Sequence, residues 1–133
     1  MTRKPLRLVL GALLLVATTV PAAVAGTYSG TWTGKTGQKE AIKFKVNKND
    51  VVTFVKVGYE IPECGVTATT TLRNQSAKIK DGKFTVKYES STGDLKVKGT
   101  MVSASKAKGT LNASYTPAFG CQGAIKTKWS ANK

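Results

Sequence analysis

The sequence predicts an all-β protein, a single small antiparallel domain of about eight strands with one disulfide. Apolar and polar residues alternate with a period of two in several segments, and no segment after residue 25 shows a convincing helical stripe. Turn-forming residues separate these segments. The chain of 133 residues has room for one domain, and its 41% hydrophobic residues are enough for a folded core.

The alternation predicts strands that have one apolar face and one polar face, the latter rich in lysine. It is clearest over residues 42–46, 84–88, 95–98 and 125–129. With the turns between them, the strands are expected at about 27–34, 40–46, 51–59, 65–73, 83–90, 94–101, 107–115 and 122–131. The stretch 77–80 is expected to be an appendage or bulge. Lys98-Gly99-Thr100 recurs as Lys108-Gly109-Thr110, which suggests neighbouring strands of similar chemistry.

The two cysteines favour eight strands over nine. Cys64 and Cys121 are the only cysteines, and each falls in a predicted loop between strands. In an up-and-down meander, eight strands bring the two loops to the same end, where a disulfide can form. Eight strands also let the first and last strands pair antiparallel and close a barrel like that of lipocalins and avidins, which would leave no strand edge exposed. A two-sheet β-sandwich built from the same strands remains the alternative.

Residues 1–25 have the three parts of a cleaved secretory signal peptide. Arg3, Lys4 and Arg7 are followed by an apolar run and by Ala23-Val24-Ala25, a typical cleavage site. Residues 26–133 would then be a secreted, all-β domain with no membrane span, and the formal charge would fall from +14 to +11. We expect the protein outside the cytoplasm, in a periplasm or at the cell exterior, where the disulfide can persist.

The composition argues against catalysis. The sequence has no histidine, the commonest general acid or base and the commonest metal ligand. Several of its seven acidic residues lie at predicted turns, where carboxylates commonly accept hydrogen bonds from the backbone. No phosphate-binding loop, nucleophile elbow or calcium loop is present. We therefore expect no enzymatic activity, no catalytic residues, no metal site and no cofactor.

The basic residues are the strongest indication of function. Nearly all of them after residue 25 are lysines, and many lie on the polar faces of predicted strands. The candidates for binding polyanions are Lys43, Lys45, Lys96, Lys98, Lys126 and Lys128. A broad positive field attracts anionic polymers or acidic surfaces. Sequence-specific nucleic-acid binding is not expected, because base recognition favours arginine. The alternative is a structural or interaction protein without a specific ligand, in which the lysines only confer solubility.

Aromatic residues suggest a second function, that of a small-ligand carrier. Tyr59, Tyr115 and Phe119 flank the two cysteine loops and would form an aromatic rim around a barrel mouth. Trp32 and Trp129 lie in the first and last predicted strands, and we expect them to make core contacts that seal the barrel.

The two ends of the domain form a recognisable pattern. Residues 26–30 read G-T-Y-S-G, and residues 123–131 read G-A-I-K-T-K-W-S-A. With the two spaced cysteines, this pattern resembles small exported bacterial all-β domain proteins that begin G-T-Y-S-G and end W-x-A. The resemblance implies secretion and an all-β fold, but no activity and no functional residues. The Gly30-Thr31-Trp32 start also looks like that of avidin-type barrels, although the further tryptophans of their biotin sites are absent.

Overall fold

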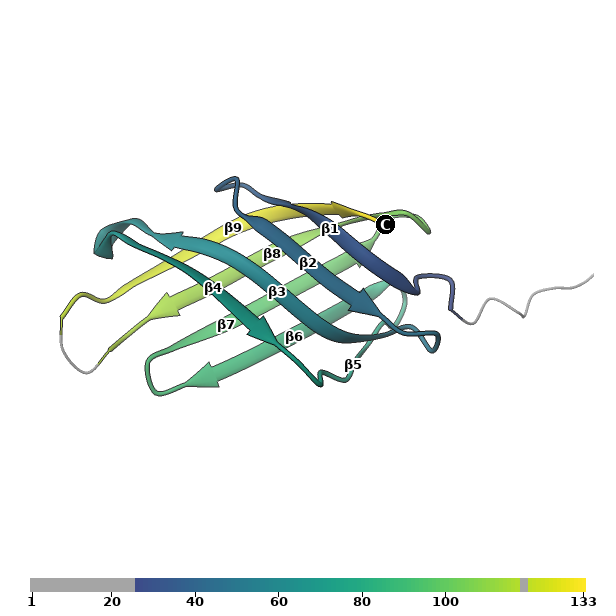
Figure 1. The fold of residues 1–133 in the computed structure, drawn as a ribbon, viewed down its shortest axis with the longest axis horizontal. Helices are drawn as coiled ribbons and strands as arrows, with labels where there is room; N and C mark the ends of the chain where they lie inside the picture. The colour runs from purple at the N-terminus through teal and green to yellow at the C-terminus, as the bar shows by residue number, and fades with distance from the viewer. Residues whose placement is uncertain (1–25, 118–119) are drawn as a thin grey trace, which may run out of the picture.

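Antiparallel strands form a flattened, nearly closed barrel in the computed structural model, which describes residues 26–117 and 120–133 (Figure 1). The strands are β1 (Gly30–Thr36), β2 (Ala41–Val46), β3 (Val51–Ile61), β4 (Val66–Leu72), β5 (Ala77–Lys78), β6 (Lys83–Ser90), β7 (Gly93–Met101), β8 (Lys106–Tyr115) and β9 (Gly123–Asn132). A single 3-10 turn, η3 (Pro62–Cys64), separates β3 from β4. The predicted all-β fold with eight long strands is confirmed. The proposed signal peptide, residues 1–25, and Phe119 lie outside the described residues.

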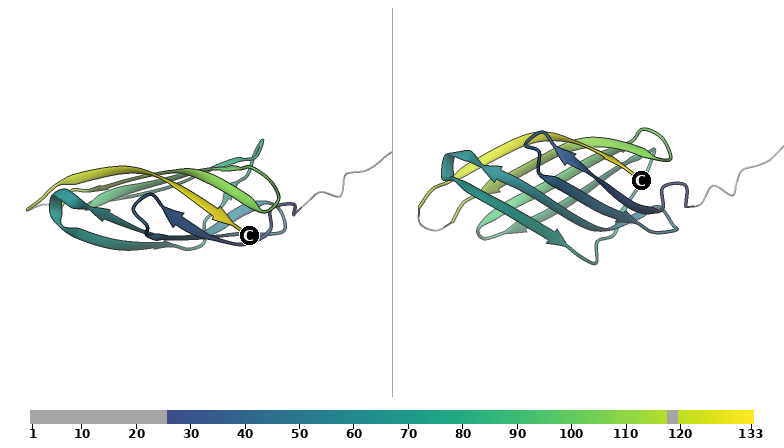
Figure 2. Two further views of the ribbon diagram at one scale, coloured as in Figure 1. Left: turned by 90° about the horizontal axis from the view of Figure 1, so that it is seen from above. Right: turned by 45° about the horizontal axis from the view of Figure 1, so that its top comes forward.

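Hydrogen bonding runs through the strands in the order β4-β3-β2-β1-β9-β8-β7-β6. The strands form two layers, β1–β4 and β6–β9, which Figure 2 shows facing each other. The layers join where β1 pairs antiparallel with β9, with Thr33 opposite Asn132 and Thr36 opposite Trp129. The predicted pairing of the first and last strands is therefore confirmed.

The barrel is open on the opposite side, between β4 and β6. No described strand pairs with the outer edge of β4, so the expectation that closure removes every exposed edge is wrong. The cause is the connection from residue 73 to residue 82, which is too long for a hairpin. Its central strand β5 pairs with the start of β3, and the amide of Ile79 donates to the carbonyl of Asp50 at 2.9 Å. This connection directs β6 into the second layer, and residues 77–80 form the short accessory strand β5 and a bridge rather than a ninth long strand.

Four aromatic rings fill the centre of the barrel. Phe44 stacks on Trp32 at 5.6 Å between ring centroids, lies 5.3 Å from Phe84, and meets Trp129 edge-on at 5.6 Å. All four side chains are buried. The tryptophans are core residues, as expected, and Phe44 lies between them. Each indole N–H donates to a backbone carbonyl, so neither buries an unsatisfied donor.

Two glycines make room for these rings on the inner face of the second layer. The repeated tripeptides lie on neighbouring strands, as expected, with Gly99 directly opposite Gly109. Phe84 lies opposite Gly99, and Trp129 lies opposite Gly109. A Cβ atom on Gly109 would come within 2.6 Å of Cζ2 of Trp129, closer than carbon atoms pack. The aromatic rings therefore cover the glycines.

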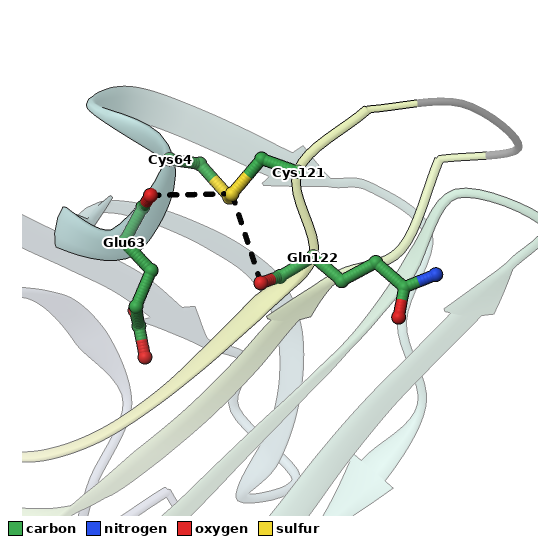
Figure 3. The surroundings of a disulfide bond; sticks show 4 residues. All are labelled: Glu63, Cys64, Cys121 and Gln122. Atoms are coloured by element: carbon green, nitrogen blue, oxygen red, sulfur yellow. Dashed lines mark hydrogen bonds between the residues drawn. A yellow bond between two sulfur atoms is a disulfide. The ribbon is translucent and has the colours of Figure 1, made fainter.

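A disulfide links the two loops at one end of the barrel, as predicted. Sγ of Cys64, in η3, is bonded to Sγ of Cys121, in the loop between β8 and β9, at 2.06 Å (Figure 3). Sγ of Cys121 also lies 3.2 Å from the carbonyl oxygen of Glu63. This is a contact rather than a hydrogen bond, because a sulfur in a disulfide carries no proton. The bridge ties the first layer to the second, and such bonds persist in oxidising compartments.

Candidate binding surfaces

Lysines cover the outer surface of the second layer. Side chains alternate between the two faces of each strand, so the residues between the buried positions of β6–β9 point outward. We call this surface the lysine face, and it carries Lys83, Lys87, Lys96, Lys98, Lys108, Lys126 and Lys128. The strand registers bring these residues from four strands into three adjoining cross-strand rows.

One of these rows concentrates charge around a single amide. Lys87 lies opposite Lys96, Lys96 opposite Asn112, and Asn112 opposite Lys126. Neighbouring strands are about 4.8 Å apart, so the row places three positive charges within about 15 Å. Like charges that lie directly opposite each other destabilise a sheet. The Lys87–Lys96 pair therefore carries an energetic cost that a bound anion would relieve.

The same row crosses a trough of about 580 Å³ on the outer surface. Lys87, Lys96 and Lys126 line it, and Asn112 lies between the lysines of the neighbouring strands. The Oδ1 atom of Asn112 is buried and has no hydrogen-bond partner among the described residues. Oδ1 can only accept a hydrogen bond, so the lysine ammonium groups of the row are suited to it, and it would not bind an anion directly.

Acidic side chains limit the lysine face at one end. Glu89 lies opposite Asp94 in the next outward row, towards the β6–β7 hairpin, and both line the trough. An anion in the trough is therefore favoured near Lys96 and Lys126 and disfavoured near the hairpin.

The structure separates the predicted lysines into two groups. Lys96, Lys98, Lys126 and Lys128 come together on the lysine face. Lys43 and Lys45 lie on β2 in the first layer, where Lys43 faces Lys56 of β3. The residues predicted to bind polyanions did not include Lys87 or Asn112. Lys87 lies within an alternating segment and was recognisable as outward-facing, whereas nothing local marks Asn112 as the centre of the row.

A second candidate site lies at the seam between β4 and β6. Tyr59, Tyr88 and Tyr115 line a cleft of about 440 Å³ there, together with several threonine and serine hydroxyl groups. The hydroxyl of Tyr59 is 2.9 Å from Oγ1 of Thr70, which fixes its ring against β4. Tyr88 is 46% exposed, although it lies on the same face of β6 as the buried residues Phe84 and Val86. No strand covers it at the open seam.

The cleft differs from the lysine face in charge. Asp94 is the one charged residue among those that line it. The predicted mouth residues Tyr59 and Tyr115 both line the cleft, whereas Phe119 lies outside the described residues. Sequence reasoning missed Tyr88, whose exposure follows from the open seam.

Other types of site are not found in the described part of the chain. Residues 26–117 and 120–133 contain no group of three or more histidine, cysteine or acidic residues placed to hold a metal ion. They also contain no helix with the length and hydropathy needed to cross a membrane. No family model, curated protein or solved structure matches the chain.

Proposed function

We propose that the protein is an exported, non-catalytic module that binds anionic polymers through the lysine face. The observation that carries this proposal is the cross-strand row of Lys87, Lys96 and Lys126, which the pairing of β6–β9 brings together on one outward surface. The trough beside it is open to solvent on the outer surface of β6–β9. The disulfide and the signal-like sequence of residues 1–25 support export.

The chemistry of the face favours a polymer of phosphate or sulfate esters. Lysine ammonium groups are compact point charges on flexible stems, and they follow a chain of anions without requiring one geometry. The face spans four strands, so several esters of one polymer can be neutralised together. Binding of this kind depends on charge density rather than on base sequence, and it weakens as salt rises.

The proposal predicts tight, salt-sensitive retention on heparin and on inorganic polyphosphate. A Lys87→Gln/Lys96→Gln/Lys126→Gln variant is expected to elute from heparin at lower salt than the unmodified protein. For duplex DNA each neutralised phosphate adds about 0.9 to the slope of log K against log salt, so losing three contacts should flatten the slope by about 2–3. Titration at several salt concentrations measures this slope.

A matched control removes three lysines from the other layer. Lys43→Gln/Lys45→Gln/Lys56→Gln changes the net charge equally but leaves the lysine face intact. We expect this variant to keep most of the slope. If both variants lose the same affinity, net charge alone drives binding and the lysine face is not a site. Heparin binding without polyphosphate binding, or the reverse, distinguishes sulfated from phosphorylated polymers.

The tyrosine-lined cleft supports a second candidate function, the binding of a small uncharged ligand. The centre of the barrel is filled by Trp32, Phe44, Phe84 and Trp129, so a carrier would use the seam rather than the interior. Pockets for small ligands combine apolar and aromatic walls with a few polar groups, and the cleft has this composition.

The uncharged dye Nile red tests the cleft independently of the lysines. We expect the native protein to bind the dye, and a Tyr88→Arg variant to lose this binding. Thr85→Arg places the same charge on the outward face of the same strand and should have no effect. Equal binding by both variants, or none by the native protein, would exclude the cleft as a site for apolar ligands. Dye fluorescence measures the outcome.

A further inference from the structure

The outer edge of β4 is a free strand edge that lacks the usual protection against pairing. β4 pairs with β3 over seven consecutive residue pairs without a register shift, and no described strand pairs with its other edge. Thr67, Thr69 and Thr71 on its outward face are exposed. A straight edge of this kind presents unpaired N–H and C=O groups, which form a template for another strand.

β4 is also the one long strand of the described chain without a charged residue. Its sequence is VTATTTL, whereas each of the other seven long strands carries at least one lysine. The other edge strand, β6, carries Lys83, Lys87 and Glu89. Charged residues on an edge discourage pairing, so β6 is protected and β4 is not. In a chain so rich in lysine, this difference marks β4 as an interaction edge.

The sequence of β4 suits pairing with itself. In an antiparallel pair centred on Thr69, Val66 lies opposite Leu72, Thr67 opposite Thr71, and Ala68 opposite Thr70. Inward residues then meet inward residues and outward residues meet outward ones, as a continuous sheet requires. The outward pairs are all threonine with threonine, which is a favourable cross-strand combination.

Charges next to β4 are complementary in the same register. Within one copy, Glu60 lies opposite Thr67, and Lys56 lies opposite Thr71. In the dimer, Thr67 of one copy would lie opposite Thr71 of the other. Each such cross-strand row then begins at Glu60 of one copy and ends at Lys56 of the other copy. Arg73 likewise falls opposite Gly65 of the other copy, two residues from Glu63.

We propose that the protein forms a two-fold symmetric dimer in which β4 pairs antiparallel with β4 of a second copy, centred on Thr69. The contact is self-complementary, as a two-fold interface must be. The two-fold axis is perpendicular to the continuous sheet that the two β1–β4 layers form. Both β6–β9 layers therefore lie on the same side of this sheet. Both lysine faces then point in the same direction. The dimer would therefore be able to bind one polymer at two places, a consequence that rests on the proposed function.

Sedimentation of the purified protein over a range of concentrations and salt tests the dimer. Added salt screens the repulsion between two positive copies, so dimerisation should strengthen with salt, whereas polyanion binding should weaken. Thr69→Lys places two lysines opposite each other and should weaken the dimer about tenfold or more. Thr85→Lys adds the same charge to the outward face of the protected edge strand β6 and should leave the dimer unchanged.

A cross-linking variant keeps the proposal testable if Thr69→Lys fails to fold. Thr69→Cys should form a disulfide-linked dimer on mild oxidation, because residue 69 faces itself across the axis. Thr67→Cys, which faces residue 71 of the other copy, should cross-link poorly. A protein that stays monomeric up to millimolar concentration in high salt overturns the proposal, as does a dimer unaffected by Thr69→Lys. A monomeric protein, or a monomeric Thr69→Lys variant, that still binds heparin would leave the proposed function intact.

Discussion

Replacing Phe44 with alanine is expected to lower the free energy of unfolding by about 4 kcal/mol, because it opens a cavity among three other aromatic rings. Phe44 is fully buried and contacts Trp32, Phe84 and Trp129. These rings come from both layers of the barrel, so their separation weakens the packing between the layers. Urea denaturation followed by tryptophan fluorescence measures the change.

Phe54→Ala is the matched control for this prediction. Phe54 lies on the outward side of β3, opposite Lys45, and Nζ of Lys45 is 4.9 Å from its ring centroid. The guanidinium carbon of Arg73 lies 5.5 Å from the same ring. Removing a partly exposed ring with cation–π contacts should cost about 1 kcal/mol. Equal losses for the two variants would contradict the assignment of Phe44 to the centre of the core.

Removing the disulfide is expected to have an effect of similar size. The bridge closes a loop of 58 residues from Cys64 to Cys121. In the chain-entropy model a loop of this length contributes about 4 kcal/mol, because the bond restricts the unfolded chain. A Cys64→Ser/Cys121→Ser variant should therefore lose most of this stability. A domain of this size has a modest core, so the loss is a large fraction of its total stability.

Denaturation of the double variant, with the oxidised native protein as reference, measures the contribution of the bridge. The native protein reduced and alkylated under denaturing conditions and then refolded should show the same loss. Intact mass after alkylation without reductant should reveal no free thiol in the native form. Labelling of two thiols, or a variant as stable as the native protein, would show that the bridge does not stabilise the fold.

Local patterns predicted the strands and the disulfide well. The alternation of Phe84, Val86 and Lys87, or of Leu95 and Lys96, places each side chain on one face of its strand, because a strand repeats every two residues. The strand positions agreed with the structure to within three residues. The two cysteine loops met at one end because an eight-stranded meander reverses direction at each turn.

The seam was not predictable in the same way. A meander alone suggests that β4 pairs with the next long strand, β6. The connection between them is instead held by the pairing of β5 with Val51 and Val52, which depends on residues distant in the sequence. The exposure of Tyr88 and the free edge of β4 both lie along the seam that this connection spans.

The candidate site was predictable only in its chemistry. The lysine-rich faces of the strands follow from sequence, but the strand neighbours decide which lysines act together. Pairing of β7 with β8, and of β8 with β9, groups Lys96 with Lys126 around Asn112. Pairing of β2 with β1 and β3 places Lys43 and Lys45 in the other layer.

By itself, therefore, the sequence determined the all-β class, the strands and their polar faces, and the pairing of Cys64 with Cys121. The tertiary structure alone decided where the barrel stays open, which lysines share a face, and which strand keeps a free edge. The physical reason is that the orientation of a side chain in a strand depends on adjacent residues. The identity of its neighbours depends instead on hydrogen bonds between strands far apart in the chain.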